Sequence, residues 1–139
     1  MARRNDCYVD TSAFIAFLDR SERHHTLFRR LFGNSTPLIT SALTIAEGHG
    51  WFLRKYNPQR AMQFLAFIRE LPRLTIEPFG GAALSDAGVY ALKFQDRKLT
   101  LADAHGLAIM NSHAVRSCWS TDRHLGLTGV PLATHDMPE

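Results

Sequence analysis

The stretch CYVDTSAFIAFLD, residues 7–19, decides how the rest of the chain is interpreted. It begins with an apolar run that is typical of a buried strand, and Asp10 ends that run. The mostly apolar residues that follow predict a helix. A carboxylate at the end of a core strand loses hydration, which costs free energy unless another group compensates for its charge. Asp10 is therefore either the cap of the next helix or one member of a charged site.

The composition is that of a single folded domain, residues 1–139. With 45% hydrophobic and 21% charged residues, the chain has the material for one ordinary core. No apolar stretch approaches the ~20 residues that a membrane helix needs, and Asp10 and Asp19 interrupt the early apolar run that a secretory signal requires. Cys7 and Cys118 lack the spacing of zinc or redox motifs, so we interpret them as reduced core thiols of a cytoplasmic protein.

Strand patterns alternate with helix patterns along the chain, and the connections between them are short. This order predicts an α/β domain with a mainly parallel central sheet. In such sheets, functional sites lie outside the carboxyl ends of the strands, which is where Asp10 stands. The predicted strands are 5–9, 37–40, 73–79, 115–122 and 130–134, and the predicted helices are 11–20, 24–32, 41–56, 58–71, 82–95 and 101–112.

Three further acidic residues are expected at the same edge of the sheet as Asp10. Asp122 closes a second apolar run, SCWSTD, and so repeats the pattern of Asp10. Glu47 and Asp103 lie in the early turns of helices that follow strands. Such helices begin on the carboxyl-end side of a parallel sheet, so their first turns face the same crevice. The predicted topology therefore brings all four carboxylates together.

Each acidic residue also has a purely structural interpretation. Asp10 and Asp122 are candidate N-caps of the elements that follow them. The pairs Thr44–Glu47 and Thr100–Asp103 both have the spacing of a capping box. Capping does not require the four residues to converge, whereas a shared site does, and the two interpretations therefore differ in a testable way.

Four carboxylates in one pocket repel each other, and a divalent cation is the natural way to offset that repulsion. Ligation by oxygen alone selects Mg²⁺ or Mn²⁺. The chain has 16 basic and 13 acidic residues, so without these four acids its net charge rises from +3 to +7. An acidic, metal-binding cleft in a basic domain suits phosphodiester hydrolysis, because the cation activates water while Arg and Lys bind the flanking phosphates.

The motifs around the four acids also resemble those of a known family. The chain contains, in order, YVDTSAFIAFLD, LITSALTIAEGHGWFLRK, DRKLTLADAHGLAIM and STDRHL. Their order and spacing resemble those of PIN-domain proteins, and in particular the VapC-type ribonuclease toxins of toxin–antitoxin pairs, over residues 8–125. The resemblance implies a PIN-like three-layer α/β/α sandwich and a Mg²⁺- or Mn²⁺-dependent endoribonuclease. Asp10, Glu47, Asp103 and Asp122 match the catalytic, metal-binding acids of the family.

The same resemblance suggests supporting residues and partners. Thr11, Ser12 and Thr121 match hydroxyl positions beside the acids, where they either hydrogen-bond a carboxylate or a bound water or cap helices. The family implies an RNA substrate (tRNA, rRNA or mRNA), a cognate VapB-like antitoxin that blocks the cleft, and a homodimer. The apolar residues of 61–71 surround much of that predicted helix, so we hypothesise self-association through it. Arg97, Lys98 and Arg123 flank the predicted cleft, and we hypothesise that they contact RNA phosphates.

The histidines offer no separate metal motif, because the sequence contains no HxH or HExxH spacing. His105 follows Asp103 by two residues, a rotation of roughly 200° on a helix, so we expect it to point away from the acids and pack elsewhere. His49 stands in the same relation to Glu47. His124 fits the family pattern or simply packs beside its loop.

Two other functions remain as alternatives. A non-catalytic PIN-like module would bind RNA or an antitoxin without cleaving, and cleavage with and without EDTA distinguishes it. A phosphatase of the haloacid-dehalogenase type needs a second Asp two residues after its nucleophile, and here that position is Ser12. A phospho-receiver domain needs an acceptor Asp near the middle strand, and 73–79 has none.

Overall fold

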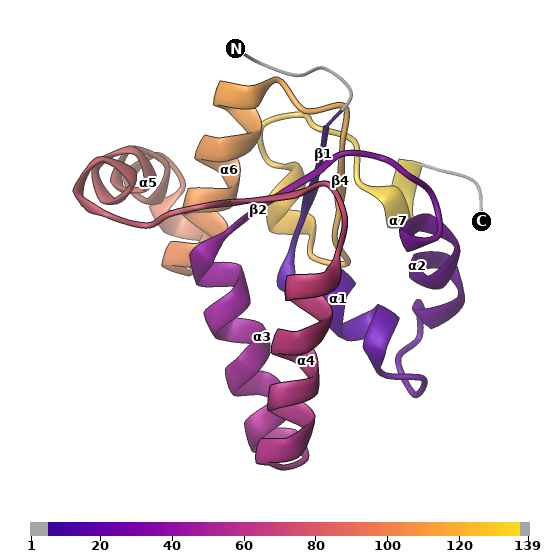
Figure 1. Cartoon of the computed structure of the whole chain (residues 1–139). Coiled ribbons are helices and arrows are strands. Elements are labelled where there is room, and N and C mark those ends of the chain that lie inside the picture. Colours follow the sequence, from indigo (N-terminus) through magenta and orange to yellow (C-terminus); the bar gives the residue numbers. More distant parts are fainter. Residues whose placement is uncertain (1–5, 137–139) are drawn as a thin grey trace.

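The computed structural model describes residues 6–136. A four-stranded sheet lies at its centre, in the order β3-β2-β1-β4, and every neighbouring pair of strands is parallel (Figure 1). The central strand β1 pairs with β2 through Tyr8 and Ile39, and with β4 through Tyr8 and Cys118. The strands are β1 Cys7–Val9, β2 Leu38–Ser41, β3 Leu74–Glu77 and β4 Ser117–Trp119.

Helices cover both faces of this sheet, which confirms the predicted α/β/α sandwich. One face packs against α1 to α4 and the other against α5 and α6. The helices are α1 Thr11–Leu18, α2 His25–Phe32, α3 Ala42–Lys55, α4 Pro58–Glu70, α5 Gly81–Lys93, α6 Leu101–His113 and α7 Ala133–Asp136, with short 3₁₀ turns at η1 Gln95–Arg97 and η2 Arg123–Gly126. No helix in the described part of the chain combines the length and apolar character needed to cross a bilayer.

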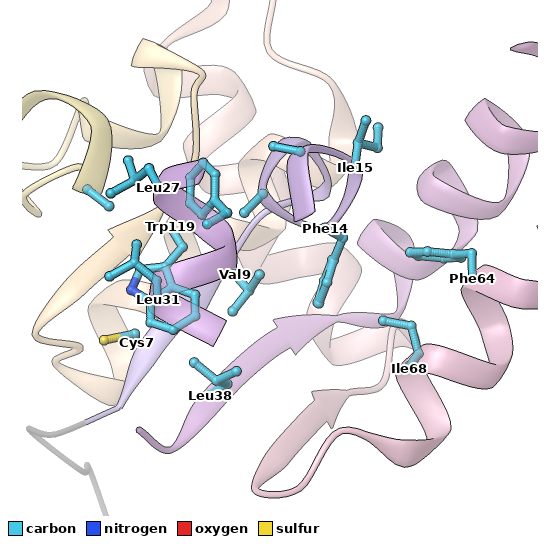
Figure 2. Close-up of a cluster of buried hydrophobic side chains, with 14 of the residues drawn as sticks. Cys7, Val9, Phe14, Ile15, Leu27, Leu31, Leu38, Phe64, Ile68 and Trp119 are labelled. Carbon is cyan, nitrogen blue, oxygen red and sulfur yellow. The ribbon is translucent and has the colours of Figure 1, made fainter. Parts of the chain in front are cut away.

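The alternation of side chains along β1 explains why there are two cores. Cys7 and Val9 point to one face, where they join Trp119 and residues of α1, α2 and α4 (Figure 2). Tyr8 points to the opposite face and packs with Leu107 of α6. Both faces of β1 are buried, which explains why its sequence is a continuous apolar run, as expected for a parallel sheet. Cys7 and Cys118 are both buried and unpaired by any disulfide.

Most apolar side chains of α4 pack against other helices of the same chain. Phe64 and Ile68 are buried, and Phe67 stacks on Phe17 with ring centroids 5.0 Å apart. Met62, by contrast, is 55% exposed. The broad apolar pattern of 61–71 therefore reflects contacts with neighbouring helices of the same chain more than an open face.

Two local predictions are confirmed by hydrogen bonds at helix starts. Asn57 accepts from the backbone N–H of Arg60 at 2.8 Å, with Pro58 in the first helical position. Thr100 and Asp103 form a complete capping box at the start of α6.

The predicted start of the helix 41–56 is confirmed, because Ser41 is the N-cap of α3. The alternative capping box of Thr44 and Glu47 does not form, since Thr44 lies inside the helix. One local prediction is wrong. The stretch 130–134 is not a full strand, because only an isolated bridge joins Leu132 to Cys118 before α7 begins. Pro131 lacks an N–H and cannot continue a ladder.

Candidate active site

The four predicted acids lie on four different elements. Asp10 immediately follows β1, and Asp122 follows β4 by three residues. Glu47 stands in the second turn of α3, and Asp103 in the first turn of α6. The negative charges of the other three all raise the pKa of Glu47, after the larger effect of its own burial. The fold therefore brings the four carboxylates into one electrostatically coupled cluster.

Asp10 is the most enclosed of the four. It stands at the N-cap position of α1, yet its Oδ2 accepts hydrogen bonds from the hydroxyls of Ser12 at 3.0 Å and Ser120 at 2.9 Å. Burial raises the pKa of Asp10, the two hydroxyls lower it, and the charge of Asp103 raises it further. The net direction is upward, which shows that the hydroxyls only partly compensate for lost hydration.

Ser120 is the residue that sequence reasoning missed. It is fully buried, and besides Asp10 it accepts a hydrogen bond from the backbone N–H of Asp122 at 2.9 Å. Ser12 completes the link, because its Oγ accepts from the N–H of Thr121 at 2.9 Å. The two serines therefore connect the β1–α1 junction to the loop after β4. The pairing of Val9 with Trp119, which only the structure shows, sets residue 120 beside residue 10.

A separate set of hydroxyls supports Glu47, a surface residue whose carboxyl group is only partly buried. Thr11 Oγ1 donates to Glu47 Oε1 at 3.1 Å and lies 3.2 Å from the carbonyl oxygen of Thr44. Tyr8 reaches the hydroxyl of Thr44 at 3.2 Å from beneath the site. Thr11 and Ser12 thus each contact one acid directly. Thr121 contributes only through its backbone N–H, which donates to Ser12 beside Asp10.

Asp103 and Asp122 come together with His124. Asp122 Oδ1 accepts from the backbone N–H of His124 at 2.9 Å, and its distance to His124 Nδ1 is 3.4 Å. Asp103, Asp122 and His124 each offer a ligand atom, and the three atoms lie within 4.8 Å of one another. Burial and the charge of Asp122 raise the pKa of Asp103, while His124 lowers it.

The chemistry of this donor set fits a divalent cation. Carboxylate oxygens are the preferred protein ligands of Mg²⁺ and Mn²⁺. The pKa values of Asp10, Glu47 and Asp103 are raised, first by burial and then by the negative charge of the neighbouring acids. A cation compensates for such an excess of negative charge. Asp103 and Asp122 offer it two carboxylate oxygens within 4.8 Å of each other.

The basic residues predicted to flank the cleft are all exposed. Arg97 and Lys98 lie in and just after η1, ahead of α6, and Arg123 directly follows Asp122. Arg97 lies 3.8 Å from Asp96, an exposed pair that solvent screens. All three side chains are accessible to a polyanion.

His105 points away from the acids, as predicted from its position on the helix. It is buried, its Nδ1 lies 2.7 Å from Ser41 Oγ, and its ring meets the edge of Phe79 at 5.0 Å. Burial lowers its pKa. It lines a cavity of about 430 Å³ between α5 and α6, to which Glu77 and Asp86 also contribute. His49 is half-buried on α3.

Comparison with known proteins identifies relatives over nearly the whole chain. The PIN domain family matches residues 7–129. Ribonuclease VapC26 of Mycobacterium tuberculosis is 25% identical over 118 residues, which make up 83% of this chain and 85% of the relative.

Solved structures share the fold. VapC20 of Mycobacterium tuberculosis, described as a Sarcin-Ricin loop cleaving toxin, superposes with a TM-score of 0.80 at 19% identity, covering 89% of this chain and 95% of that one. A toxin–antitoxin complex from Klebsiella pneumoniae contains a chain with a TM-score of 0.56 at 20% identity, covering 91% and 94%. At these identities the likeness is one of fold.

Proposed function

The chain belongs to the PIN-domain family, and from this premise we propose that it is a divalent-metal-dependent endoribonuclease acting as the toxin of a toxin–antitoxin pair. The observation that carries the proposal is the coupled cluster of Asp10, Glu47, Asp103 and Asp122 at the carboxyl end of the sheet. The named relatives are a ribonuclease and a toxin that cleaves the Sarcin-Ricin loop.

In this mechanism the four carboxylates hold the ion, which is Mg²⁺ or Mn²⁺. When bound, the ion supplies Lewis-acid activation of water and compensates for charge that develops on the scissile phosphate. Ser12 and Ser120 orient Asp10, and Thr11 orients Glu47. Arg97, Lys98 and Arg123 bind flanking phosphates of the RNA. No side-chain nucleophile is required, because water is the attacking group.

The partners follow from the same family. An antitoxin binds the chain and blocks the acidic cluster, in keeping with the toxin–antitoxin complex of similar fold. The chain acts on RNA in the cytoplasm and forms a homodimer. Exposed apolar side chains on β3 and α5 offer a surface for self-association: Ile76, Leu84, Val89 and Leu92. Light scattering that finds only monomer at micromolar concentration contradicts the homodimer.

The test of the function is cleavage of a defined RNA with and without EDTA. We expect Mn²⁺- or Mg²⁺-dependent endonucleolytic products from the wild-type chain and none from Asp103→Asn. Asp96→Asn is the matched control, because Asp96 is a 79% exposed acid a few residues before α6 and outside the cluster. Cleavage that persists in EDTA removes the metal-dependent mechanism.

A chain that binds RNA without cutting it would instead be the non-catalytic module. The basic residues give a second readout for RNA contact. Removing the charges of Arg97, Lys98 and Arg123 should weaken RNA binding and flatten its dependence on salt, because each phosphate contact releases counterions. An unchanged salt slope excludes these residues from the contact surface.

A further inference from the structure

His124 is the side chain near the acids that the proposed mechanism leaves without a role. Its backbone N–H and its ring Nδ1 both approach Asp122 Oδ1, at 2.9 Å and 3.4 Å. A ring nitrogen of His124 and one carboxylate oxygen each from Asp103 and Asp122 also lie within 4.8 Å of one another. Two atoms bound to one ion at about 2.1 Å lie at most about 4.2 Å apart, so a small rotation of the side chains closes the remaining distance.

The fold holds the turn that carries His124 close to α6. Leu125, the next residue, is fully buried. A Cβ placed on Gly106 of α6 would meet Leu125 Cδ1 at 3.1 Å and Tyr8 Oη at 2.8 Å. The missing side chain at Gly106 therefore lets η2 approach the helix that also carries Asp103. This contact fixes the backbone next to His124 and limits the motion of its ring relative to Asp103.

We propose that His124 supplies a nitrogen ligand to the divalent ion held by Asp103 and Asp122, and that this ligand shifts the preference of the site from Mg²⁺ towards Mn²⁺. The inference rests on the metal-dependent function proposed above. Mg²⁺ is a hard ion that selects oxygen ligands and dehydrates reluctantly. First-row transition ions accept imidazole nitrogen more readily. Adding one imidazole to the carboxylate ligands therefore favours Mn²⁺ relative to a site of oxygen ligands alone.

The competing role for His124 is an ion pair with Asp122. In that role the ring is charged, both of its nitrogens carry protons, and neither can bind a metal. The chain contains a similar contact between a histidine and a carboxylate elsewhere for comparison. His113 Nε2 lies 2.9 Å from Glu77 Oε1, and these side chains are 27% and 32% exposed, against 38% and 39% for His124 and Asp122. His113 is thus a matched control outside the acidic cluster.

The experiment measures metal binding by the whole chain in the absence of RNA. The variants are His124→Asn, which places an oxygen where Nδ1 stood, and the control His113→Asn. Calorimetric titration gives the affinities for Mn²⁺ and Mg²⁺, and pulsed electron paramagnetic resonance of the bound Mn²⁺ detects a coordinated ¹⁴N nucleus. Circular dichroism establishes that both variants keep the wild-type fold.

We expect nitrogen coupling in the wild-type chain and in His113→Asn, and its loss in His124→Asn. Mn²⁺ affinity should fall at least about tenfold in His124→Asn, since even residues that only support a ligand cost about 10–100-fold when removed. Mg²⁺ affinity should change by less than about threefold, because the asparagine oxygen is a ligand that Mg²⁺ accepts.

Wild-type Mn²⁺ without nitrogen coupling, or equal Mn²⁺ affinity in His124→Asn, overturns the role of His124 and leaves the nuclease proposal intact. A wild-type chain that binds neither ion overturns the metal-dependent nuclease itself. A chain that binds Mn²⁺ through His124 but does not cleave RNA overturns the nuclease and keeps the ligand assignment.

Discussion

Helix α1 has a buried aspartate at each end, and the two have opposite acid–base behaviour. Asp10 precedes the helix and is 7% exposed, while Asp19 follows it and is 4% exposed. The pKa of Asp10 is raised, whereas that of Asp19 is lowered to about 2. Burial raises the pKa at both positions, but at Asp19 the hydrogen bonds and the cation of its neighbours outweigh it.

The neighbours of Asp19 are all favourable to its charge. Its Oδ1 accepts from the backbone and hydroxyl of Ser21, at 3.0 and 2.7 Å, and its Oδ2 accepts from the hydroxyl of Tyr56 at 2.7 Å. Lys55 adds a cation at 3.5 Å. Asp10 instead has two hydroxyl donors and the repulsive charge of Asp103. One end of the helix stabilises the fold through its carboxylate, and the other carries the carboxylate that the proposed mechanism assigns to the cation.

The largest expected effect is on the cleavage rate, which should fall when Asp10 is replaced but not when Asp19 is replaced. Asp10→Asn should reduce the rate of metal-dependent RNA cleavage by about 10²-fold or more, because loss of a ligand exceeds the ~10–100-fold cost of losing a residue that supports one. Initial rates at saturating Mn²⁺ measure this effect. Asp19→Asn, the control at the other end of the helix, should cleave at the wild-type rate per folded molecule. Similar losses in both variants would contradict the division of roles.

The second expected effect is on the free energy of unfolding, which should fall when Asp19 is replaced. Asp19→Asn should lower the free energy of unfolding by about 2 kcal/mol at pH 7, given a pKa near 2 in the folded state and ~3.9 in the unfolded chain. The change leaves Tyr56 and Lys55 facing an amide instead of a carboxylate. Urea unfolding measures it. The solvated Asp96→Asn should differ from the wild type by less than about 0.5 kcal/mol.

Ser120→Ala tests the hydroxyl support of Asp10. We expect a decrease of about tenfold in cleavage rate, the lower end of the range for residues that orient metal ligands. The variant removes the donor to Asp10 Oδ2 and the acceptor of the Asp122 N–H. Ser120→Thr, which retains a hydroxyl, should recover part of the rate. A wild-type metal affinity and rate in Ser120→Ala would show that Ser12 orients Asp10 alone.

The smallest expected effect is on how the free energy of unfolding depends on pH, which should differ in sign between Asp10 and Asp19. In EDTA, Asp10→Asn should be more stable than the wild type at pH 7 by about 1 kcal/mol, because burial and the charge of Asp103 make the ionised form of Asp10 less favourable in the folded state than in the unfolded chain. This difference should vanish as pH falls from the raised folded pKa of Asp10 to its unfolded value, where both states become protonated.

For Asp19 the order is reversed. Its folded pKa is depressed, so its stabilisation is complete above the unfolded pKa near 4 and is lost as pH falls through about 2. Unfolding of the two variants and the wild type between pH 2 and pH 7 measures both trends. Parallel curves for all three proteins would refute the comparison.

Much of the site could be predicted because its signals are local. Asp10 and Asp122 each end an apolar run, and Thr100 and Asp103 form a capping box within one turn of helix. These patterns span at most a few residues, and the backbone geometry of strands and helices converts them directly into positions. The parallel topology then implies that strand ends and helix starts face one another.

The alternative that the structure rejects and the prediction that it corrects both concern short local patterns. Ser41 rather than Thr44 caps α3, although either residue type can serve as an N-cap. The stretch 130–134 has strand-like composition, yet Pro131 and the start of α7 limit it to a single bridge. Propensity alone does not choose between such alternatives.

The order of elements, the two-sided burial of the sheet and the convergence of the acids were determined by the sequence itself, through periodicity and residues close in the chain. Only the tertiary structure decided that Ser120 meets Asp10, that Tyr56 donates a hydrogen bond to Asp19, and that the ring of His124 lies within 4.8 Å of Asp103. These contacts join residues many positions apart through strand register and through the close approach of η2 to Gly106. Contacts between residues so far apart in the sequence depend on tertiary packing, which a local sequence pattern does not determine.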